Sequence, residues 1–371
     1  MGYELGQQSN QLKSFDLTID GTKITNSQLL NLTLNWNINN FKVVGELMFR
    51  DMSNLVEHMP IRGNNTVAVA MTDYDDEVSK QEFKVTDVQY SRVDSGEPVV
   101  KLLLCDPITL SAMQMYNEMS WDKADMIEII DHPETLKPLL TGKKKDFCPP
   151  LPKHKNFCMP LHVPFSNVYQ WLARNNNVFF YQTRKDFVIQ PIKKLFSRGK
   201  KGDKFYYKAP NNFYRRKIYE SVSHFGKVIE ANAFQPNAKI ASFVPGSKHA
   251  KWKKNDFKKA LGDISSKGKT DADLPGTTDK HYYKSDYHIK EVVDYMWQKN
   301  AYQDLELEIL VPGQFATNIG DIVELDIVNY TETTEPEYNI NGEWLIVEIT
   351  DKILGTDFIQ TLRLTRAKFS K

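Results

Sequence analysis

The sequence lacks the features that mark several large classes of protein. Three cysteines, Cys105, Cys148 and Cys158, are too few and odd in number for the disulfide framework of a secreted protein, so a reducing compartment fits best. No apolar run is long enough to span a bilayer, and the N-terminus lacks the pattern of a signal peptide. The formal net charge of +1 gives no global attraction to nucleic acid or to an anionic membrane. We therefore expect neither export by a signal nor membrane insertion.

Motifs that carry chemistry are also missing. There is no Gly-x-Ser-x-Gly elbow, no His-Glu-x-x-His, no P-loop and no dinucleotide fingerprint. The strongest metal-like spacing is formed by Cys148, His154, Cys158 and His162. It contains no Cys-x-x-Cys pair, so ordinary cysteines and surface histidines explain it better, and elemental analysis would decide the question. We expect no catalytic, cofactor-binding or metal-binding residues and no enzyme activity.

What the sequence does contain is a degraded internal repeat, with copies about 260 residues apart. Phe83 corresponds to Trp344 at a separation of 261 residues, and Leu102 corresponds to Leu362 at 260. Gly63 is matched with Gly320 at 257. The segments of the first copy are Gly45–Phe49, Pro60–Gly63, Val67–Met71, Phe83–Val88 and Val99–Leu104, and those of the second are Leu305–Ile309, Asn318–Asp321, Ile322–Ile327, Trp344–Ile349 and Phe358–Leu364.

Each repeated segment has the pattern of a β-strand with one buried face. Apolar and polar residues alternate, and Gly, Asn and Asp turns separate the segments. Asp94–Gly96 and Leu354–Asp357 precede the last strand of their copies, where a hairpin needs residues that tolerate positive φ. The repeat predicts two similar antiparallel β-barrels of short strands.

Between the copies the pattern becomes mixed. Trp121–Ile130 is predicted to be a short amphipathic helix, and Asn167–Arg174 a second helix with Ser166 as its N-cap. Val178–Gln182 and Phe187–Pro191, joined by a turn at Arg184–Asp186, predict an aromatic hairpin.

The whole chain is therefore predicted to be mainly β with an α+β insert. We expect a first tube-like β-barrel at 1–107, the α+β insert at 108–205, a second tube-like barrel built from 206–245 with 301–371, and a loop-rich and helical insertion at 246–300. Lysine and arginine crowd the middle of the chain, and acids predominate in Tyr302–Glu348. Solvated loops explain the basic runs more simply than a surface for a polyanion.

This arrangement resembles the baseplate central hub proteins of contractile-tailed bacteriophages, and more distantly the N-terminal hub part of type VI secretion spike proteins. The residues that carry the resemblance are Asn167–Leu172 leading into Phe179–Tyr181, followed by Leu307–Gly313 and Ile319–Leu325. The resemblance covers nearly the whole chain.

The resemblance implies a structural virion protein of the tail baseplate, made in the host cytoplasm. Three copies with two similar barrels each would form a ring of six barrels, which adapts a six-fold tail tube to a trimeric cell-puncturing spike and lines a DNA channel. Implied partners are two further copies of the chain, a tail tube or tube-initiator protein, wedge proteins and DNA in transit. Because the sequence ends at Lys371, the spike is expected to be a separate polypeptide. Ring contacts are expected on Leu47–Phe49, Val67–Met71, Leu305–Ile309 and Ile322–Ile327.

Other functions stay open on the sequence alone. A contractile injection or type VI-like system would use a similar hub. A polysaccharide-binding or polysaccharide-degrading β-protein would use the aromatic middle and the acids, and would show a cleft with carboxylates of perturbed pKa. A nucleic-acid-binding double barrel would use the basic middle and bind with a steep salt dependence.

Overall fold

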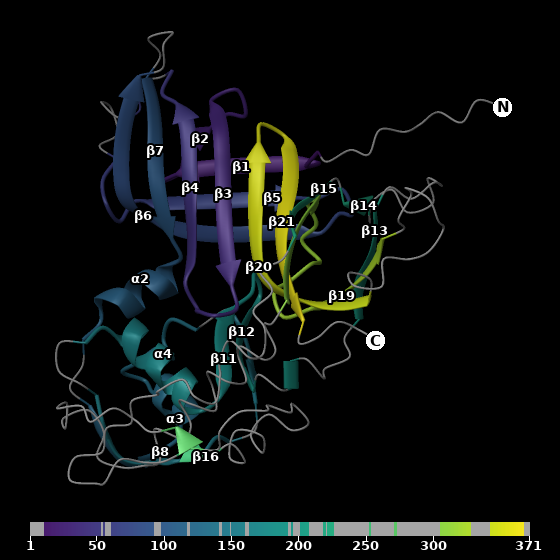
Figure 1. Ribbon diagram of the computed structural model, residues 1–371. Coiled ribbons are helices and arrows are strands. Elements are labelled where there is room, and N and C mark those ends of the chain that lie inside the picture. The colour runs from purple at the N-terminus through teal and green to yellow at the C-terminus, as the bar shows by residue number, and fades with distance from the viewer. Residues whose placement is uncertain are drawn as a thin grey trace.

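The protein is mainly β, as the sequence predicts, with a small α+β part below the strands (Figure 1). This computed structural model describes residues 11–52, 55, 61–92, 98–116, 119–140, 143–148, 150–159, 163–191, 194–195, 201–207, 218–219, 221–225, 252–253, 271–272, 305–327 and 342–366. In that part of the chain, fourteen strands belong to one sheet. They are β1 (Ser14–Ile19), β2 (Thr22–Ile24), β3 (Leu29–Asn37), β4 (Val43–Arg50), β5 (Thr66–Thr72), β6 (Val78–Arg92), β7 (Pro98–Cys105), β13 (Lys201–Tyr207), β14 (Ile218–Tyr219), β15 (Ser221–Phe225), β18 (Leu305–Pro312), β19 (Ile322–Ile327), β20 (Gly342–Leu354) and β21 (Asp357–Arg366).

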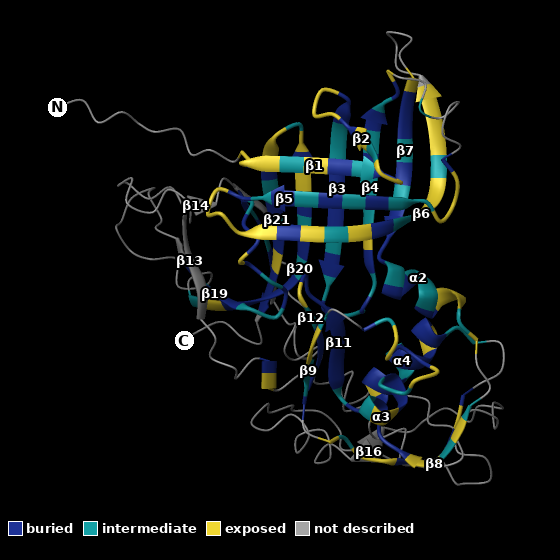
Figure 2. Ribbon diagram, turned by 180° about the vertical axis from the view of Figure 1, so that it is seen from behind, coloured by how far each residue is buried: buried dark blue, intermediate teal, exposed yellow. Residues whose placement is uncertain are grey.

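The sheet folds into two crossing layers. β1 and β5 run across the back of β3, β4 and β7, as the two opposite views show (Figures 1 and 2). β6 belongs to both layers, because its first half pairs with β5 and its second half with β7. A register shift between Val85 and Asp87 marks the change of partner. Such a bulge bends a strand and lets it turn a corner between layers.

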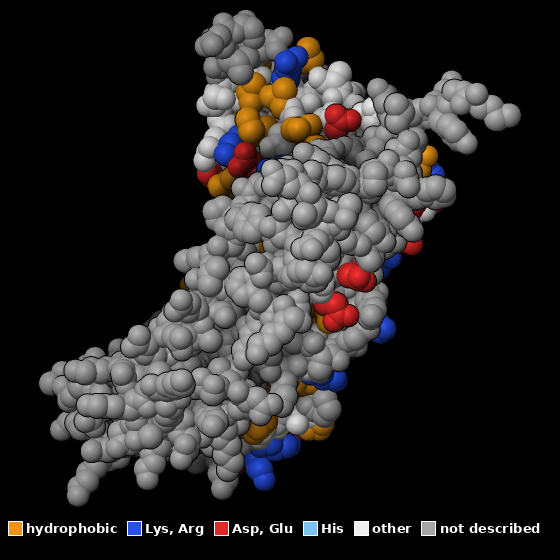
Figure 3. All heavy atoms as spheres, turned by 45° about the vertical axis from the view of Figure 1, so that its right-hand side comes forward, with side chains coloured by type: hydrophobic (Ala, Val, Ile, Leu, Met, Phe, Trp, Pro, Cys, Tyr) orange, Lys and Arg blue, Asp and Glu red, His pale blue; other side chains and the backbone are white. Residues whose placement is uncertain are grey.

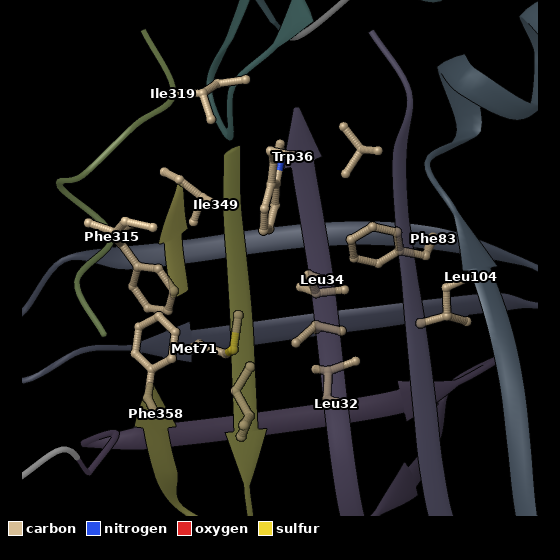
Figure 4. Close-up of a cluster of buried hydrophobic side chains, with 14 of the residues drawn as sticks. Leu32, Leu34, Trp36, Met71, Phe83, Leu104, Phe315, Ile319, Ile349 and Phe358 are labelled. Carbon is tan, nitrogen blue, oxygen red and sulfur yellow. The ribbon is translucent and has the colours of Figure 1, made fainter. Parts of the chain in front are cut away.

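The main hydrophobic core lies between these layers. Alternate residues of each strand point inward, so β3 contributes Leu32, Leu34 and Trp36, and β5 contributes Met71 (Figure 4). Phe315 and Phe358 from the C-terminal part face one another in the same cluster, with ring centroids 4.8 Å apart. The two repeated parts of the chain therefore share one core.

The internal repeat predicted from the sequence is confirmed by the strand register. β4, β7, β6 and β5 of the first copy pair in the same order and direction as β18, β21, β20 and β19 of the second. The matching rows run Leu47–Leu102–Val88 in the first copy and Ile309–Leu362–Ile349 in the second. β20 even has a register shift between Ile346 and Glu348, the position that corresponds to the bulge in β6. We call the first set, with β3 beside β4, unit 1, and the second set, with β15 beside β18, unit 2.

The turn before β5 and β19 is repeated as well, although one match from the sequence is wrong by a residue. Asn64 and Gly320 both have positive φ, 81° and 85°, and each donates its backbone N–H to a corresponding residue of β6 or β20. Gly320 therefore corresponds to Asn64 and not to Gly63. Asparagine is one of the few residues other than glycine that adopts this conformation readily. At Gly320 a β-carbon would also lie only 2.3 Å from the hydroxyl of Tyr181.

The two units join side by side through unlike strands. β3 of unit 1 pairs antiparallel with β20 of unit 2, from Asn37 opposite Glu348 to Leu32 opposite Ile353. This contact makes one continuous antiparallel ladder in the order β6, β7, β4, β3, β20, β21, β18 and β15, which we call the front ladder. Within the described residues the pairings run as one sheet and do not close either unit into a separate ring. The hairpin predicted at Leu354–Asp357 joins β20 to β21, with Gly355 at φ 62°.

The α+β insert has its own core below the sheet (Figure 1). Its elements are α2 (Pro107–Gln114), β8 (Ser120–Ala124), α3 (Met126–Ile130), β9 (Lys144–Phe147), β10 (His154–Cys158), α4 (Phe165–Asn175), β11 (Val178–Gln182) and β12 (Asp186–Pro191). The aromatic hairpin is confirmed: β11 and β12 pair antiparallel, and Phe180 and Phe187 are buried in the insert.

Two details of the predicted helices are wrong. Residues Trp121–Ala124 form a strand because β8 pairs with β10, and the helix begins only at Met126, where Asp125 and Glu128 make a capping box. Ser166 is not an N-cap: α4 begins at Phe165 after Pro164, without a side-chain cap, and Ser166 is buried within the helix.

Some predictions concern segments of which the structure describes few residues. β13 crosses the domain boundary expected at residue 205 and pairs in parallel with β19. Of the insertion expected at 246–300, only β16 (Trp252–Lys253) and β17 (Asp271–Ala272) are described. The turn expected at Asp94–Gly96 also lies outside the described residues. No helix of the described part is long and apolar enough to cross a membrane.

Candidate functional site

The strands expected to make ring contacts show one buried and one accessible face. On β5, Val67, Val69 and Met71 are buried, and the residues between them are partly exposed. On β4, Leu47 and Phe49 are buried and Met48 is partly exposed. β18 alternates in the same way from Leu307 to Val311, whereas on β19 Ile322 and Val323 are both buried. The inward faces of these strands thus belong to the core, and only their outward faces and free edges are accessible to a partner.

The outward face of the front ladder is mixed, with polar side chains at the join between β3 and β20 and exposed apolar ones such as Val44 and Leu354 farther along it. Asn35 donates a hydrogen bond of 2.8 Å to Glu348, and Asn37 donates one of 2.9 Å to the other oxygen of that carboxylate, so the join between β3 and β20 carries polar pairs across it. Arg363 of β21 forms an ion pair with Glu348 at 3.3 Å. At the upper end of the molecule, hydrophobic side chains lie beside basic and acidic ones (Figure 3). Neither sign of charge dominates the residues of this face.

The two ends of the front ladder differ from the strands inside it. The second half of β6 pairs with β7 on one side, while its pairing with β5 stops at Lys84. Along residues 86–92, the structure describes no strand on the other side. In Figure 2 much of this half-strand is coloured as exposed. Tyr90 is 56% exposed although it lies two residues from Val88, which packs against the core.

A buried ion pair holds the insert to both units. Arg184, on the turn of the aromatic hairpin, donates to both oxygens of Asp351 of β20 at 2.8 and 2.7 Å. The Arg184 guanidinium also lies over the ring of Trp36, 4.8 Å from its centroid, and donates to the carbonyl of Thr317 at 2.6 Å. The side chains of Arg184 and Asp351 are 4% and 0% exposed. Gln360 donates the further hydrogen bond that Asp351 accepts, at 2.8 Å.

Sequence reasoning missed this junction, although one signal was present. Asp351 lies in phase with Ile349 and Ile353 on a strand whose inward face is apolar, and a carboxylate in that phase needs a buried partner. Arg184 gave no comparable signal, since it was expected in a turn between the strands of a hairpin.

A second polar cluster lies where the insert meets unit 1. The ammonium group of Lys143 donates to Gln182 at 2.6 Å and lies 3.7 Å from Asp106, and Gln182 donates to the carbonyl of Phe41 at 2.7 Å. Burial lowers the pKa of Lys143, and the nearby Asp106 carboxylate opposes this shift. Asp106 is already engaged, because it caps α2 through the N–H groups of Ile108 and Thr109.

A cavity of about 590 Å³ opens beside this cluster, between α2 and the outward face of the back layer. Its lining mixes small, apolar and charged side chains: Asp16, Thr18, Ala68, Val69, Ala70, Lys80, Gln81, Glu82, Asp106, Pro107, Ile108, Leu139, Lys143 and Arg184. The lining holds three acidic and three basic residues, so the cavity does not select for either sign of charge.

The candidate metal spacing does not form a metal site among the described residues. His154 is buried and contacts Asn176 through its Nε2 atom at 3.0 Å, whereas Cys158 is exposed. These two residues stand at opposite ends of β10, about 13 Å apart at the usual rise of a strand, too far to share one ion. Cys148 is buried, with a pKa raised by that burial, and His162 lies outside the described residues. No group of three or more His, Cys, Asp or Glu in the described part is placed to hold a metal.

Comparison with known proteins identifies solved structures of similar fold. No protein-family model matches the chain, and no curated protein matches it by sequence. Among solved structures, the 43 kDa tail protein of prophage MuSo2 from Shewanella oneidensis is similar, with a TM-score of 0.59 and 12% identity over 96% of this chain and 99% of that one. The tail protein from Neisseria meningitidis MC58 is similar with a TM-score of 0.58 and 9% identity, over 95% and 96% of the two chains.

These two matches span nearly the full length of both partners. At such low sequence identity they show a similar fold and say nothing about activity. The mainly β fold with an α+β insert that the sequence predicts is therefore confirmed, and within the described residues the two similar sets of antiparallel strands expected to be barrels belong to one sheet. The chain has the fold of these two tail proteins.

Proposed function

We propose that the protein is the structural hub of a phage tail, a trimer whose six β-units form a ring with pseudo-six-fold symmetry. The observation that carries this proposal is the join between the two units of one chain. If a two-fold axis related them, equivalent strands would meet, β3 with β15 or β6 with β20. Instead β3 meets β20, an unlike pair. A head-to-tail contact of this kind propagates into a ring when its rotation closes.

In this proposal a trimer solves a mismatch of symmetry. Three chains present six similar units, so one face can dock on a six-fold tail tube while the other meets a three-fold spike. We propose that residues 1–107 form the first of these units, 206–245 with 301–371 the second, and 108–205 a buttress outside the ring toward wedge or spike proteins. The buried Arg184–Asp351 pair supports this placement, since it fixes the insert to unit 2 at the side of β20.

The proposed role requires rigid joints and no turnover of a substrate. DNA would pass through the ring after release of the spike, and the mature protein would be found in the virion. The outward face of the front ladder suits a channel through which a polyanion slides, because its basic residues Lys101 and Arg363 are paired with acids and the described residues form no continuous basic surface there.

The test is the native mass of the purified full-length chain by light scattering. The proposal predicts about 129 kDa, three times the chain mass of 42.9 kDa. It also predicts binding of this trimer to isolated tail tubes and no binding to the outer surface of intact tails. A mass of one chain at the highest soluble concentration, together with absence of the protein from purified virions, would refute the hub.

A further inference from the structure

The first half of β6 has one edge that no described strand covers. Residues 78–84 pair with β5 on one side, and β7 covers the other side only from Lys84 onward, where Lys84 lies opposite Cys105. β7 ends at Cys105 because the chain turns there into α2, which Asp106 caps. Within the described residues no strand continues the line of β7 past this point. In Figure 2, β6 is the lowest of the three crossing strands, and its open edge faces the insert.

The register shows which backbone groups lie on this edge. Val85 donates its N–H to the carbonyl of Asn65, a pair that extends the β5–β6 register by one residue. Hydrogen-bonded pairs alternate along an antiparallel ladder, so the odd-numbered residues of β6 bond to β5. The N–H and C=O groups of Lys80 and Glu82 therefore point away from β5. Among the described residues these four groups have no hydrogen-bond partner.

The same edge opens into the cavity of about 590 Å³ described above. Lys80, Gln81 and Glu82 all line this cavity, although successive side chains of a strand point to opposite faces of the sheet. A space that all three side chains reach lies around the edge of β6 and not on one face alone. Its volume is within the usual range for ligand sites.

Contacts of the chain itself bound the open edge at both ends. At one end β7 takes over the pairing. Toward the other end, Gln81 donates to the carbonyl of Arg184 at 3.2 Å, and Lys185 forms an ion pair with Glu77 at 3.4 Å. The edge between them, residues 78–83, is at most about 20 Å long at the usual rise of a strand. We call this edge and the cavity beside it the edge slot.

The backbone groups of the edge slot match an extended chain. The unpaired groups of Lys80 and Glu82 repeat after two residues, at about 6.6 Å, which is also the repeat of donors and acceptors along another strand. Unpaired groups on a strand edge recruit such strands. Proteins use this mode of recognition for short peptide segments, with affinity from the main chain and specificity from alternate side chains.

The wall of the slot favours uncharged side chains in its occupant. Lys143 and Asp106 lie 3.7 Å apart and compensate one another, so a charged side chain that entered beside them would gain no partner. Pro107, Ile108 and Leu139 form the apolar part of the wall, against which an aliphatic side chain would be buried.

We propose that the edge slot binds a short extended segment of another protein, uncharged and with aliphatic and small polar residues alternating. The segment adds to β6 as an antiparallel strand in line with β7, and it exchanges hydrogen bonds with the backbone of Lys80 and Glu82. Its aliphatic side chains pack on the wall formed by Pro107, Ile108 and Leu139. The slot lies within one chain and does not depend on the ring proposed above, so the purified chain suffices to test it.

Hydrogen exchange of the purified full chain tests whether the edge is open. With fragmentation that resolves single amides, Lys80 and Glu82 should exchange at least about tenfold faster than Gln81 and Phe83, whose N–H groups bond to β5. Equal, slow exchange of all four amides would show an edge that is already covered and would overturn the proposal.

A synthetic peptide then supplies the missing strand. The probe has about six residues, the length of the open edge, with valine and threonine alternating and its ends acetylated and amidated. At saturation it should slow exchange of the Lys80 and Glu82 amides at least about tenfold. The same peptide methylated on every backbone nitrogen is the matched control and should give no protection, because it cannot donate hydrogen bonds. A peptide with glutamate in place of valine should bind at least about tenfold more weakly.

Three variants test the two parts of the slot. Glu82→Pro removes an N–H that points into the slot and is not used in the pairing with β5, so it should weaken binding of the valine–threonine peptide at least about tenfold. Glu82→Ala keeps this N–H and should bind like the wild type. Leu139→Glu places a charge in the apolar wall and should weaken binding by a similar factor, which provides a test that does not alter β6.

The outcomes are distinct. Protection by the peptide that is lost on methylation and weakened in Glu82→Pro and Leu139→Glu supports the proposal. Equal protection by both forms of the peptide, wild-type affinity in Leu139→Glu, or no protection up to about 1 mM peptide would overturn it. Protection that rises with protein concentration in the absence of peptide would place a second copy of this chain in the slot and overturn the assignment to another protein.

Discussion

Removal of Arg184 should loosen the whole molecule, because one side chain holds the insert, β20 and β3 together. In Arg184→Ala, the Asp351 carboxylate keeps its hydrogen bond from Gln360 but loses its charged partner inside the core. Breaking a buried pair by removing one member costs about 3–5 kcal/mol, since an uncompensated charge stays buried. Lys185→Ala is the matched control next in sequence. Its ion pair with Glu77 is exposed, at 3.4 Å, so we expect a loss below about 1 kcal/mol.

Urea unfolding, followed by tryptophan fluorescence and circular dichroism in parallel, measures both changes and shows whether the transition is two-state. The double variant Arg184→Met with Asp351→Leu removes both charges and should recover much of the stability lost by Arg184→Ala. A loss below about 1 kcal/mol for Arg184→Ala, or a double variant less stable than the single one, would refute the view that this pair is a critical joint.

Three further predictions concern backbone strain, cysteine reactivity and pH. Gly320→Ala should cost about 2–5 kcal/mol in urea unfolding because of its positive φ and its close neighbour, whereas Gly355→Ala, with positive φ but open space, should cost about 1–2 kcal/mol. Burial raises the pKa of Cys105 to about 12, so near pH 8 iodoacetamide should label exposed Cys158 and spare Cys105 until the protein unfolds; mass spectrometry of the labelled peptides decides this. Burial lowers the pKa of Lys143 in the folded state below its ordinary value of 10.5, so the native state binds fewer protons at this group than the unfolded state. The free energy of unfolding of the wild type, relative to that of Lys143→Met, should therefore rise as the pH increases toward 10.5.

Patterns that depend on neighbouring residues were predictable from the sequence. The strands of both units, the aromatic hairpin and the Gly355 turn follow from period-two alternation and from residues that tolerate positive φ. The internal repeat was visible because its copies keep their order of strands, and the register confirms the matches of Phe83 with Trp344 and of Leu102 with Leu362.

What the sequence did not predict depends on contacts between distant segments. Trp121–Ala124 has a helical pattern, but pairing with β10 makes it a strand. The β3–β20 join connects residues more than three hundred positions apart, and no local pattern specifies it. The partners of Arg184 come from several separate segments. α4 begins at Phe165 after Pro164, one residue before the cap expected at Ser166.

The most direct test of the account is electron microscopy of the purified trimer viewed end-on. The proposed trimer predicts class averages with three-fold symmetry, six lobes of two alternating kinds around the ring and an open centre. Particles with two-fold symmetry, or a compact trimer without a central opening, would contradict it.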